Sequence, residues 1–465
     1  MFASTTRLFL ASLTFAFVAA VSACSTLGLP SSATQTQSTL GLSDAELRGL
    51  GQEAFLYGRP AAELARLRST PAVTNTPLTN TFTHLRGITP AGTGSCCPNQ
   101  DTLYSTAWLD VSEEPVVLTI PPLGGRYFVA QTVDIHTRNR LSPSRRTVGS
   151  AGAKYLITGM NWKGSVPAGM TRLDLKANDG MILFRIAPNG DSDLPAVNAL
   201  QDQITLKHPS GRAMTTGGFA PYNQAEPFAV LKELDRVVRR NPIGGKDGGI
   251  AKTLAALGIG TGAPFDPDRL SVREREILLE SKDAANALLE RHLPNVGERR
   301  GDWTFLAGGE TFEDDIFTRA AVAVSYILPN DFAEAIYPIA NADADGNQLS
   351  SAHTYIIDFD GPVPVGAFWS VIAYDWPAFR LQPNAYGKYS VGDRTKGLVT
   401  NADGGMDIVL SRTPPSDGNT ANWLPVPEGD FGLALRLYEP SASIIDGRWP
   451  PPRIRKLPAE ATNKK

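Results

Sequence analysis

The residues of this sequence that are best suited to chemistry lie in CCPNQDTLYSTAWLDV, residues 96–111, where a turn leads into a run of strand-forming residues. Asn99, Asp101 and Tyr104 bring an amide, a carboxylate and a phenol to this junction. We expect a structural turn that also places these side chains near a cleft, with Asp101 capping its own turn by accepting a backbone hydrogen bond. The alternative is that the junction forms a ligand-binding or catalytic site.

A second candidate group ends the strand-like run RYFVAQTVDI. Asp134, His136 and Arg138 alternate along the chain, so in a continuing strand their side chains would share one face. A histidine beside a carboxylate can act as a general base. Asp134 with His136, or Asp101 with the nearby phenol, would then activate water, and the alternative is a buried polar network that fastens loops.

Aromatic residues are frequent towards the C-terminus, and two of them are candidates for ligand binding. Tyr386 and Tyr389 lie in the loop NAYGKYSVG. An aromatic ring can stack on the apolar face of a sugar while neighbouring polar groups meet its hydroxyls. Other aromatic residues of this segment have the pattern of sandwich core, and Trp369 is expected there.

No set of residues has the spacing of a metal or cofactor site. None of the five histidines lies in an H-E-x-x-H pattern. The stretch NADADGNQLSSA, residues 341–352, starts like a calcium loop, but Ala352 stands where a bidentate carboxylate is required. A turn with solvated acids is favoured there, with a different oxygen-rich cation site as the alternative. We expect no cofactor and no metal.

The N-terminal segment has the pattern of a secretory signal. Arg7 precedes an apolar run that is too short to span a bilayer comfortably. The run ends in VSAC, which resembles a bacterial lipobox, and this resemblance implies cleavage before Cys24 and diacylation of its sulfur. Ser25, rather than Asp, follows this cysteine, and this resembles lipoproteins that Gram-negative bacteria sort to the outer membrane. We expect a signal peptide over 1–23 and a polar tether over 24–41.

Apart from the lipobox cysteine, Cys96 and Cys97 are the only cysteines, so no disulfide framework is expected. Adjacent Cα atoms are about 3.8 Å apart, whereas disulfides prefer roughly 4.4–6.8 Å. A bond between these neighbours would be strained. Two free, half-buried thiols are therefore favoured, and a redox pair is the alternative.

Composition narrows the class of protein. The chain of 465 residues is 42% hydrophobic and 20% charged, which is ordinary for a globular protein with a core. Its net charge of -3 gives no basic field for nucleic acid. The 43 glycines and 35 prolines favour turn-rich β architecture.

The sequence divides into three segments after the tether. A capping box of Ser43 and Glu46 begins a helix that leads into short strand-like runs, and this N-terminal domain is expected over 42–210. Residues 211–335 contain three helical patterns, one of which starts at a second capping box. Residues 336–465 return to strands separated by turns. The sequence thus predicts a mainly β protein with two sandwiches and a small helical domain.

Several motifs carry a resemblance to a known pair of families. PNQDTLYSTAWLDV, LGGRYFVAQTVD and RRTVGSAGAKYLI resemble domain of unknown function 1254. AIYPIANADADGNQLSSAHTYIIDF, NADGGMDIVL, NWLPVPEGDFGLALRLYEP and DGRWPPP resemble domain of unknown function 1214. The resemblance implies an immunoglobulin-like N-terminal sandwich, a small helical domain and a C-terminal jelly roll. It transfers no catalytic residues, and the Cys-Cys pair departs from the family pattern.

These observations lead to an expected function. We expect a lipid-anchored protein at the inner leaflet of the outer membrane, facing the periplasm, that binds a glycan or another polar envelope ligand. Asn99, Tyr104, Arg138, Tyr386 and Tyr389 are the binding candidates. The alternative is a periplasmic hydrolase with Asp101, Asp134 and His136 as catalytic candidates, and a purely structural envelope component is a third possibility. No nucleic acid partner is expected.

Overall fold

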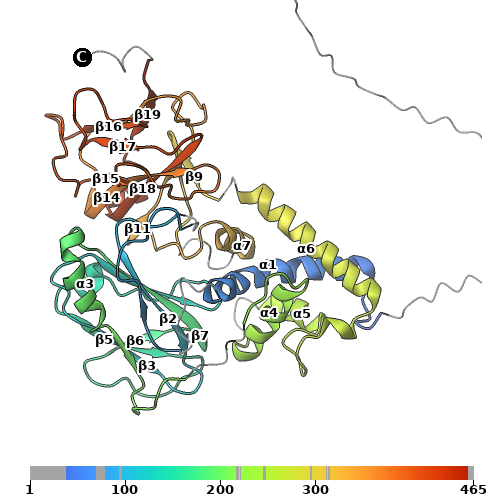
Figure 1. Ribbon diagram of the computed structural model, residues 1–465. Helices are drawn as coiled ribbons and strands as arrows, with labels where there is room; N and C mark the ends of the chain where they lie inside the picture. Colours follow the sequence, from blue (N-terminus) through green and yellow to red (C-terminus); the bar gives the residue numbers. More distant parts are fainter. Residues whose placement is uncertain are drawn as a thin grey trace, which may run out of the picture. The chain divides into compact units, whose positions relative to one another are not determined.

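The computed structural model describes residues 38–69, 79–93, 97–215, 219, 221–243, 248–293, 296–309, 312 and 315–458 (Figure 1). The predicted signal peptide, Cys24, most of the tether and Cys96 lie outside these residues. The described residues all fall within one unit of the chain. Among them, no helix combines the length and the apolar character needed to cross a membrane.

The described part is mainly β, as predicted, with nineteen strands in four sheets. Two four-stranded sheets form the N-terminal sandwich. In sheet order, the first consists of β1 (Thr83–His84), β2 (Leu103–Asp110), β7 (Asp179–Ile186) and β4 (Phe128–Asp134). The second consists of β6 (Thr171–Asp174), β5 (Ala153–Thr158), β3 (Val116–Ile120) and β8 (Thr205–Lys207). Short helices α2 (Arg145–Val148) and α3 (Leu194–Gln201) lie in its connections.

Strand β2 is buried on both of its faces. Leu103 and Leu109 point into the sandwich core, whereas Tyr104 and Trp108 belong to a second apolar cluster on the opposite face. Ala61 from the first helix packs into that second cluster. A strand with two covered faces leaves Tyr104 only partly exposed, although the residue lies on the outer side of the sandwich.

Five helices form the helical part of the molecule: α1 (Asp44–Arg68), α4 (Ala229–Arg240), α5 (Gly248–Ala256), α6 (Val272–His292) and α7 (Ile316–Ser325). Both predicted capping boxes, at Ser43 and at Ser271, are present. Gly51 lets α1 approach α6 closely, because a Cβ atom there would lie 2.8 Å from the Leu278 side chain. The structure thus packs α1 with the middle helices, whereas the sequence grouped it with the N-terminal sandwich.

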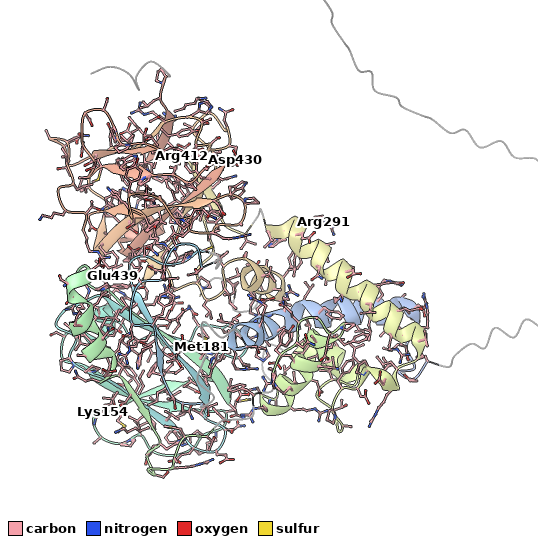
Figure 2. All side chains as sticks on the ribbon, in the orientation of Figure 1. Lys154, Met181, Arg291, Arg412, Asp430 and Glu439 are labelled. Carbon is pink, nitrogen blue, oxygen red and sulfur yellow. The ribbon has the colours of Figure 1, made fainter. Side chains whose placement is uncertain are left out.

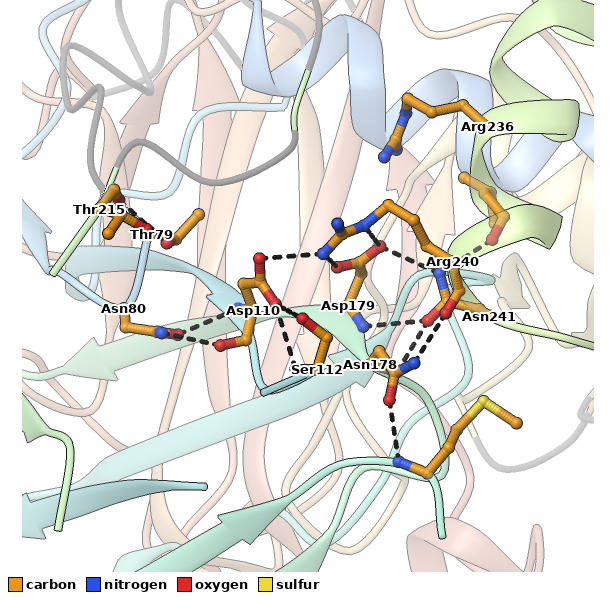
Figure 3. A network of polar contacts seen from close by, with 12 residues as sticks. Thr79, Asn80, Asp110, Ser112, Asn178, Asp179, Thr215, Arg236, Arg240 and Asn241 are labelled. Carbon is orange, nitrogen blue, oxygen red and sulfur yellow. Dashed lines mark hydrogen bonds and ion pairs between the residues drawn. The ribbon is translucent and has the colours of Figure 1, made fainter. Parts of the chain in front are cut away.

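The start of β7 is fastened to the end of α4 by a buried ion pair (Figure 3). Nε and Nη2 of Arg240 each lie 2.7 Å from an oxygen of Asp179, a residue with no exposed surface. Asn241 Nδ2 donates to the same carboxylate at 3.0 Å. Arg240 also contacts Asp110 of β2 at 2.9 Å. This cluster joins the helices to the N-terminal sandwich.

The C-terminal sandwich has a larger and a smaller sheet. The larger runs β15 (Ser390–Gly392), β14 (Val365–Asp375), β18 (Phe431–Pro440), β12 (Ile339–Ala340), β10 (Trp303–Phe305) and β9 (Glu298–Arg300), with β11 (Ala335–Ile336) also on β18. The smaller consists of β17 (Trp423–Pro425), β16 (Met406–Ser411), β13 (Tyr355–Phe359) and β19 (Arg453–Lys456), and helix α8 (Ala442–Ile445) follows β18. Trp369 is core, as predicted. Strands β9 and β10 come from the segment that the sequence assigned to helices.

The central strands β14 and β18 are also covered on both faces. Trp369 and Leu437 point into the C-terminal core. On the opposite face, Phe368 and Tyr438 pack in one cluster with Tyr127 of the N-terminal sandwich. The two sandwiches therefore contact each other through the outer faces of their sheets.

Candidate functional site

The loop that enters β2 lies between the two sandwiches. Asn99 Oδ1 accepts hydrogen bonds from the backbone N–H groups of Asp101 at 2.6 Å and Thr102 at 3.2 Å. Asn99 therefore caps this turn. The expectation that Asp101 caps its own turn is wrong, and its carboxylate is free to point towards the other sandwich.

The Asp101 carboxylate is received by the C-terminal sheet. Its Oδ2 accepts from the Ser370 hydroxyl at 2.7 Å and from the Tyr438 hydroxyl at 2.9 Å. Its Oδ1 lies 3.7 Å from Nη2 of Arg394. Asp101 is only 4% exposed. These partners come from strands that lie far along the chain, so the Asp101 contact joins the two sandwiches.

Burial keeps the surrounding phenols protonated. It raises the pKa of Tyr438 well above its usual value, and the neighbouring Asp101 raises the pKa further. Burial also raises the pKa of Tyr374. A protonated Tyr438 is a hydrogen-bond donor, which is the form that the Asp101 carboxylate requires.

Arg436 holds the other side of the loop. Its Nη2 donates to the Cys97 carbonyl at 3.1 Å and to the Tyr374 hydroxyl at 2.8 Å. Tyr374 in turn donates to the Pro98 carbonyl at 2.9 Å. Burial alone would lower the pKa of Arg436, but Tyr374, Tyr438 and other neighbours outweigh it and raise the pKa above its ordinary value.

A second buried arginine lies beside Tyr104. Arg185 of β7 pairs with Tyr104 of β2 in the sheet register, and its Cζ lies 5.5 Å from the Tyr104 ring centre. Its Nη1 donates to Gln131 Oε1 at 2.6 Å and Asn330 Oδ1 at 2.9 Å, and its Nη2 donates to the Leu328 carbonyl at 3.2 Å. We call the group formed by Arg185, Arg436, Tyr104, Asn330 and Tyr337 the arginine centre.

Neither arginine was a candidate at the level of sequence, although a signal was present. Arg185 interrupts the apolar run MILFRI, and Arg436 interrupts FGLALRLY. An arginine on a strand that is otherwise apolar is rarely buried without a specific partner. A single charge inside such a run therefore indicates a buried polar contact.

Ion pairs surround the contact between the sandwiches. Arg145 Nε donates to Glu439 Oε1 at 2.9 Å, and Arg146 Nη2 donates to Glu334 Oε1 at 2.7 Å. Figure 2 shows Glu439 where the C-terminal sandwich meets the N-terminal one. Burial raises the pKa of Glu334 although Arg146 opposes the rise.

The group Asp134, His136 and Arg138 does not form a shared face, because β4 ends at Asp134. The backbone N–H groups of His136 and Arg138 donate to Asp134 Oδ1 at 2.9 and 3.0 Å. Arg140 pairs with Oδ2 of the same carboxylate. Burial would raise the pKa of Asp134, but Arg140, His136 and Arg138 outweigh it and lower the pKa. The expected strand geometry is wrong, and Asp134 organises a turn.

The two tyrosine candidates of the C-terminal sandwich lie in different surroundings. Tyr386 is 48% exposed and places its ring edge-on at 4.7 Å from buried Trp423. Tyr389 is partly buried against the cluster that contains Tyr374. The structure does not bring Tyr386 to the arginine centre.

The loop that starts like a calcium site is a tight turn. Asp343 Oδ1 accepts from the backbone N–H groups of Asp345 at 3.0 Å and Asn347 at 2.9 Å. Asp343 is 1% exposed, so the expectation of solvated acids is wrong for this residue. No three His, Cys, Asp or Glu side chains in the described ranges are placed to hold a metal ion together.

Cys97 differs from its expected state, because it is disulfide-bonded. Its bonding partner lies outside the described residues. The expectation of a free thiol is therefore wrong for Cys97. Its backbone has a φ of 55°, in the left-handed region that a non-glycine residue rarely occupies.

An open pocket of about 500 Å³ lies at one end of the N-terminal sandwich. Its lining is mostly polar: Met160, Asn161, Trp162, Lys163, Gly164, Arg172, Asp174 and Lys176. The sequence interpretation missed this pocket, because its residues come from the turn after β5 and, separately, from β6 and the residues that follow it. We call it the Trp162 pocket.

The Trp162 pocket carries more positive than negative charge. Arg172 lies with its Cζ 5.3 Å from the Trp162 ring and pairs with Asp174 at 3.3 Å. Lys163 and Lys176 form no ion pair with any residue that the structure describes. Lys176 also has a φ of 55°, and such strained backbone is concentrated at functional sites.

Comparison with protein families identifies both sandwiches. Residues 79–208 match the protein of unknown function DUF1254, and residues 334–442 match the protein of unknown function DUF1214. Together these matches cover just over half of the chain. The chain belongs to the DUF1254/DUF1214 family. This DUF1254/DUF1214 protein thus has one of its two family regions on each side of the Asp101 contact.

Solved structures support the fold. The VPA0106 protein from Vibrio parahaemolyticus is 24% identical with a TM-score of 0.69, over 89% of this chain and 100% of that chain. An uncharacterized protein from Burkholderia cenocepacia is 13% identical with a TM-score of 0.44, over 89% of this chain and 94% of that one. No curated protein matches the sequence. The first likeness shows a shared fold, which the DUF1254/DUF1214 assignment also implies.

Proposed function

We propose that the protein is a lipid-anchored component of the bacterial cell envelope that binds an acidic or otherwise polar glycan. The observation that carries the binding proposal is the Trp162 pocket. It combines an indole with an amide, a carboxylate and three cationic side chains. Sugar recognition uses an aromatic surface together with a few placed polar groups.

The charge of the pocket narrows the ligand. Lys163 and Lys176 have no ion-pair partner among the described residues, and Arg172 shares its charge with Asp174. A ligand with carboxylate or phosphate groups would be attracted to this surface. We therefore favour an acidic glycan over a neutral one.

Titration calorimetry with neutral and acidic oligosaccharides tests the binding proposal. Trp162→Ala and Lys163→Ala should each weaken binding of the acidic ligand about tenfold, a loss typical of one good contact. Tyr386→Ala is the matched control, because it removes another partly exposed aromatic ring far from these residues in sequence. If only the Tyr386 variant lost binding, the glycan site would lie on the C-terminal sandwich instead. If the wild type bound no glycan at all, the proposal would be overturned.

The anchor is proposed from the VSAC motif, and Cys24 lies outside the described residues. Cys24→Ser should abolish incorporation of a labelled fatty acid and release the protein from the membrane fraction. Ser25→Asp should keep the label but change the membrane in which the protein is found. A Cys24→Ser protein that still carries the fatty acid would contradict the anchor.

We propose binding in preference to the hydrolase alternative. Both oxygens of Asp134 are engaged by turn N–H groups and by Arg140. Oδ2 of Asp101 is engaged by two hydroxyl donors. A general base needs an oxygen or nitrogen within reach of the attacking water, and both Asp134 oxygens and Asp101 Oδ2 are already engaged by protein donors.

A further inference from the structure

Two buried arginines lie between the sandwiches without an ion-pair partner in the described part of the chain. Arg185 is 5% exposed and Arg436 is 6% exposed. The acceptors of Arg185 are the neutral oxygens of Gln131, Asn330 and Leu328. Arg436 donates to a carbonyl and a phenol. A buried cation is normally paired with an anion, because its desolvation is costly.

Each guanidinium also has a buried donor that no described residue accepts from. Nε of Arg185 and Nε of Arg436 have no hydrogen-bond partner among the residues that the structure describes. Buried N–H groups in folded proteins are nearly always bonded. An acceptor that also carries negative charge would satisfy these N–H groups and would offset the positive charge of the two guanidinium groups.

A short chain of contacts connects the two arginines. Asn330 accepts from Arg185 through Oδ1 at 2.9 Å and donates from Nδ2 to the Tyr337 hydroxyl at 2.8 Å. The Tyr337 ring lies 5.2 Å from Cζ of Arg436. The arginine centre is therefore a single polar region to which both sandwiches contribute.

The two tyrosines are the less buried members of this region. Tyr104 and Tyr337 are partly exposed, whereas the two arginines beside them are buried. Arginines and hydroxyl donors of this kind recognise oxyanions.

We propose that the arginine centre binds a small oxyanion, a carboxylate or a phosphate, between the DUF1254 and DUF1214 sandwiches. Arg185 and Arg436 supply the charge, and Tyr104 and Tyr337 supply hydroxyl groups beside them. The two arginines come from different sandwiches, so such an anion stabilises their contact. This site is separate from the Trp162 pocket and does not depend on the glycan proposal.

The proposal is tested by thermal denaturation of the full chain. The melting temperature is compared in acetate, malonate, phosphate and chloride at constant ionic strength. A bound oxyanion should raise Tm with its concentration by mass action, and chloride should not. Separate titrations by calorimetry then show whether the carboxylates or the phosphate bind more tightly. No rise of Tm with any oxyanion relative to chloride would overturn the proposal.

Variants locate the site. Arg185→Gln and Arg436→Gln should each weaken oxyanion binding at least tenfold. Arg394→Gln is the matched control at the same contact, because Arg394 lies near the Asp101 carboxylate, and it should bind the oxyanion as the wild type does. If either arginine variant does not fold, Tyr337→Phe, which keeps the ring and removes the hydroxyl, should weaken binding severalfold. Equal binding by wild type, Arg185→Gln, Arg436→Gln and Tyr337→Phe would place the anion elsewhere.

Discussion

The phenol of Tyr438 donates a hydrogen bond to Oδ2 of Asp101 at 2.9 Å, across 337 positions of the sequence. Asn99 Nδ2 lies 3.3 Å from the same phenol oxygen, which can accept from it. The Tyr438 hydroxyl is thus positioned from the N-terminal loop on two sides. This pair is a direct side-chain link between the two family regions of the chain.

Asp101→Ala should lower the free energy of unfolding by about 3 kcal/mol, because it leaves the buried hydroxyls of Ser370 and Tyr438 without their acceptor. Ser370→Ala should cost about 1 kcal/mol, since Asp101 keeps its other partners. Urea denaturation of both variants measures the difference. Equal, small losses would mean that the Asp101 carboxylate contributes little to the contact.

Asp179→Ala should lower the free energy of unfolding by about 3–5 kcal/mol, because it leaves Arg240 without its main buried partner. Asp110→Asn is the matched control. Asp110 contacts the same guanidinium at 2.9 Å but is less buried, so its loss should cost about 1 kcal/mol. If the Asp110 variant were the less stable of the two, the outer contact would be the stronger one.

Glu274 should make stability depend on acid. Burial raises its pKa, but hydrogen bonds from Thr39, Leu40 and Ser271 outweigh this effect and lower the pKa to about 2 from an ordinary 4.5. A lowered pKa means that the stabilisation is complete above pH 4.5 and is lost as the pH falls towards 2. Glu274→Gln should flatten stability over that window, as followed by urea denaturation at each pH. An unchanged acid limb would show that other carboxylates cause it.

His84 should make the free energy of unfolding depend on pH in a higher range than Glu274 does. Burial, with a smaller effect of Arg86, lowers the pKa of its imidazole from 6.5 to about 4. The folded state therefore favours neutral His84, and its contribution is complete above pH 6.5 and is lost as the pH falls towards 4. Nδ1 lies 2.7 Å from the Ser105 hydroxyl, which also accepts from Gln201.

His84→Gln tests this dependence. The variant should be less stable than wild type at pH 7 by about 1 kcal/mol, because His84 is half-buried and solvent reduces the effect. The difference should shrink as the pH falls towards 4. Stability measured by urea denaturation at pH 7, 5.5 and 4 checks it, and a constant difference would mean that His84 does not titrate in this range.

The longer strands were predictable from sequence because their burial pattern is strong. The run 431–440 coincides with β18, and the run 126–135 contains β4. Short strands such as β9 were missed, since three residues are too few to show a periodicity. The capping boxes were also predictable, because a serine and a glutamate three positions apart suffice to define them.

The site was less predictable. Asn99, Asp101 and Tyr104 were grouped from sequence because they follow one another at a junction, but their partners lie on strands that no local pattern connects to it. Asp134 and His136 were expected to continue a strand, and the turn that replaces it depends on Arg140 and on neighbours in space. The two buried arginines look like ordinary charges until the sheet that covers them is known.

The distance along the chain between Asp101 and Tyr438 has a consequence for biosynthesis. A ribosome that adds about 5–20 residues per second needs roughly 15 to 70 s to travel from one to the other. During that time the N-terminal sandwich can fold, whereas the Asp101 carboxylate and the outer face of its sheet stay exposed until the C-terminal sandwich is synthesised. The interval gives a chaperone its opportunity to act on this chain before the second sandwich has been made.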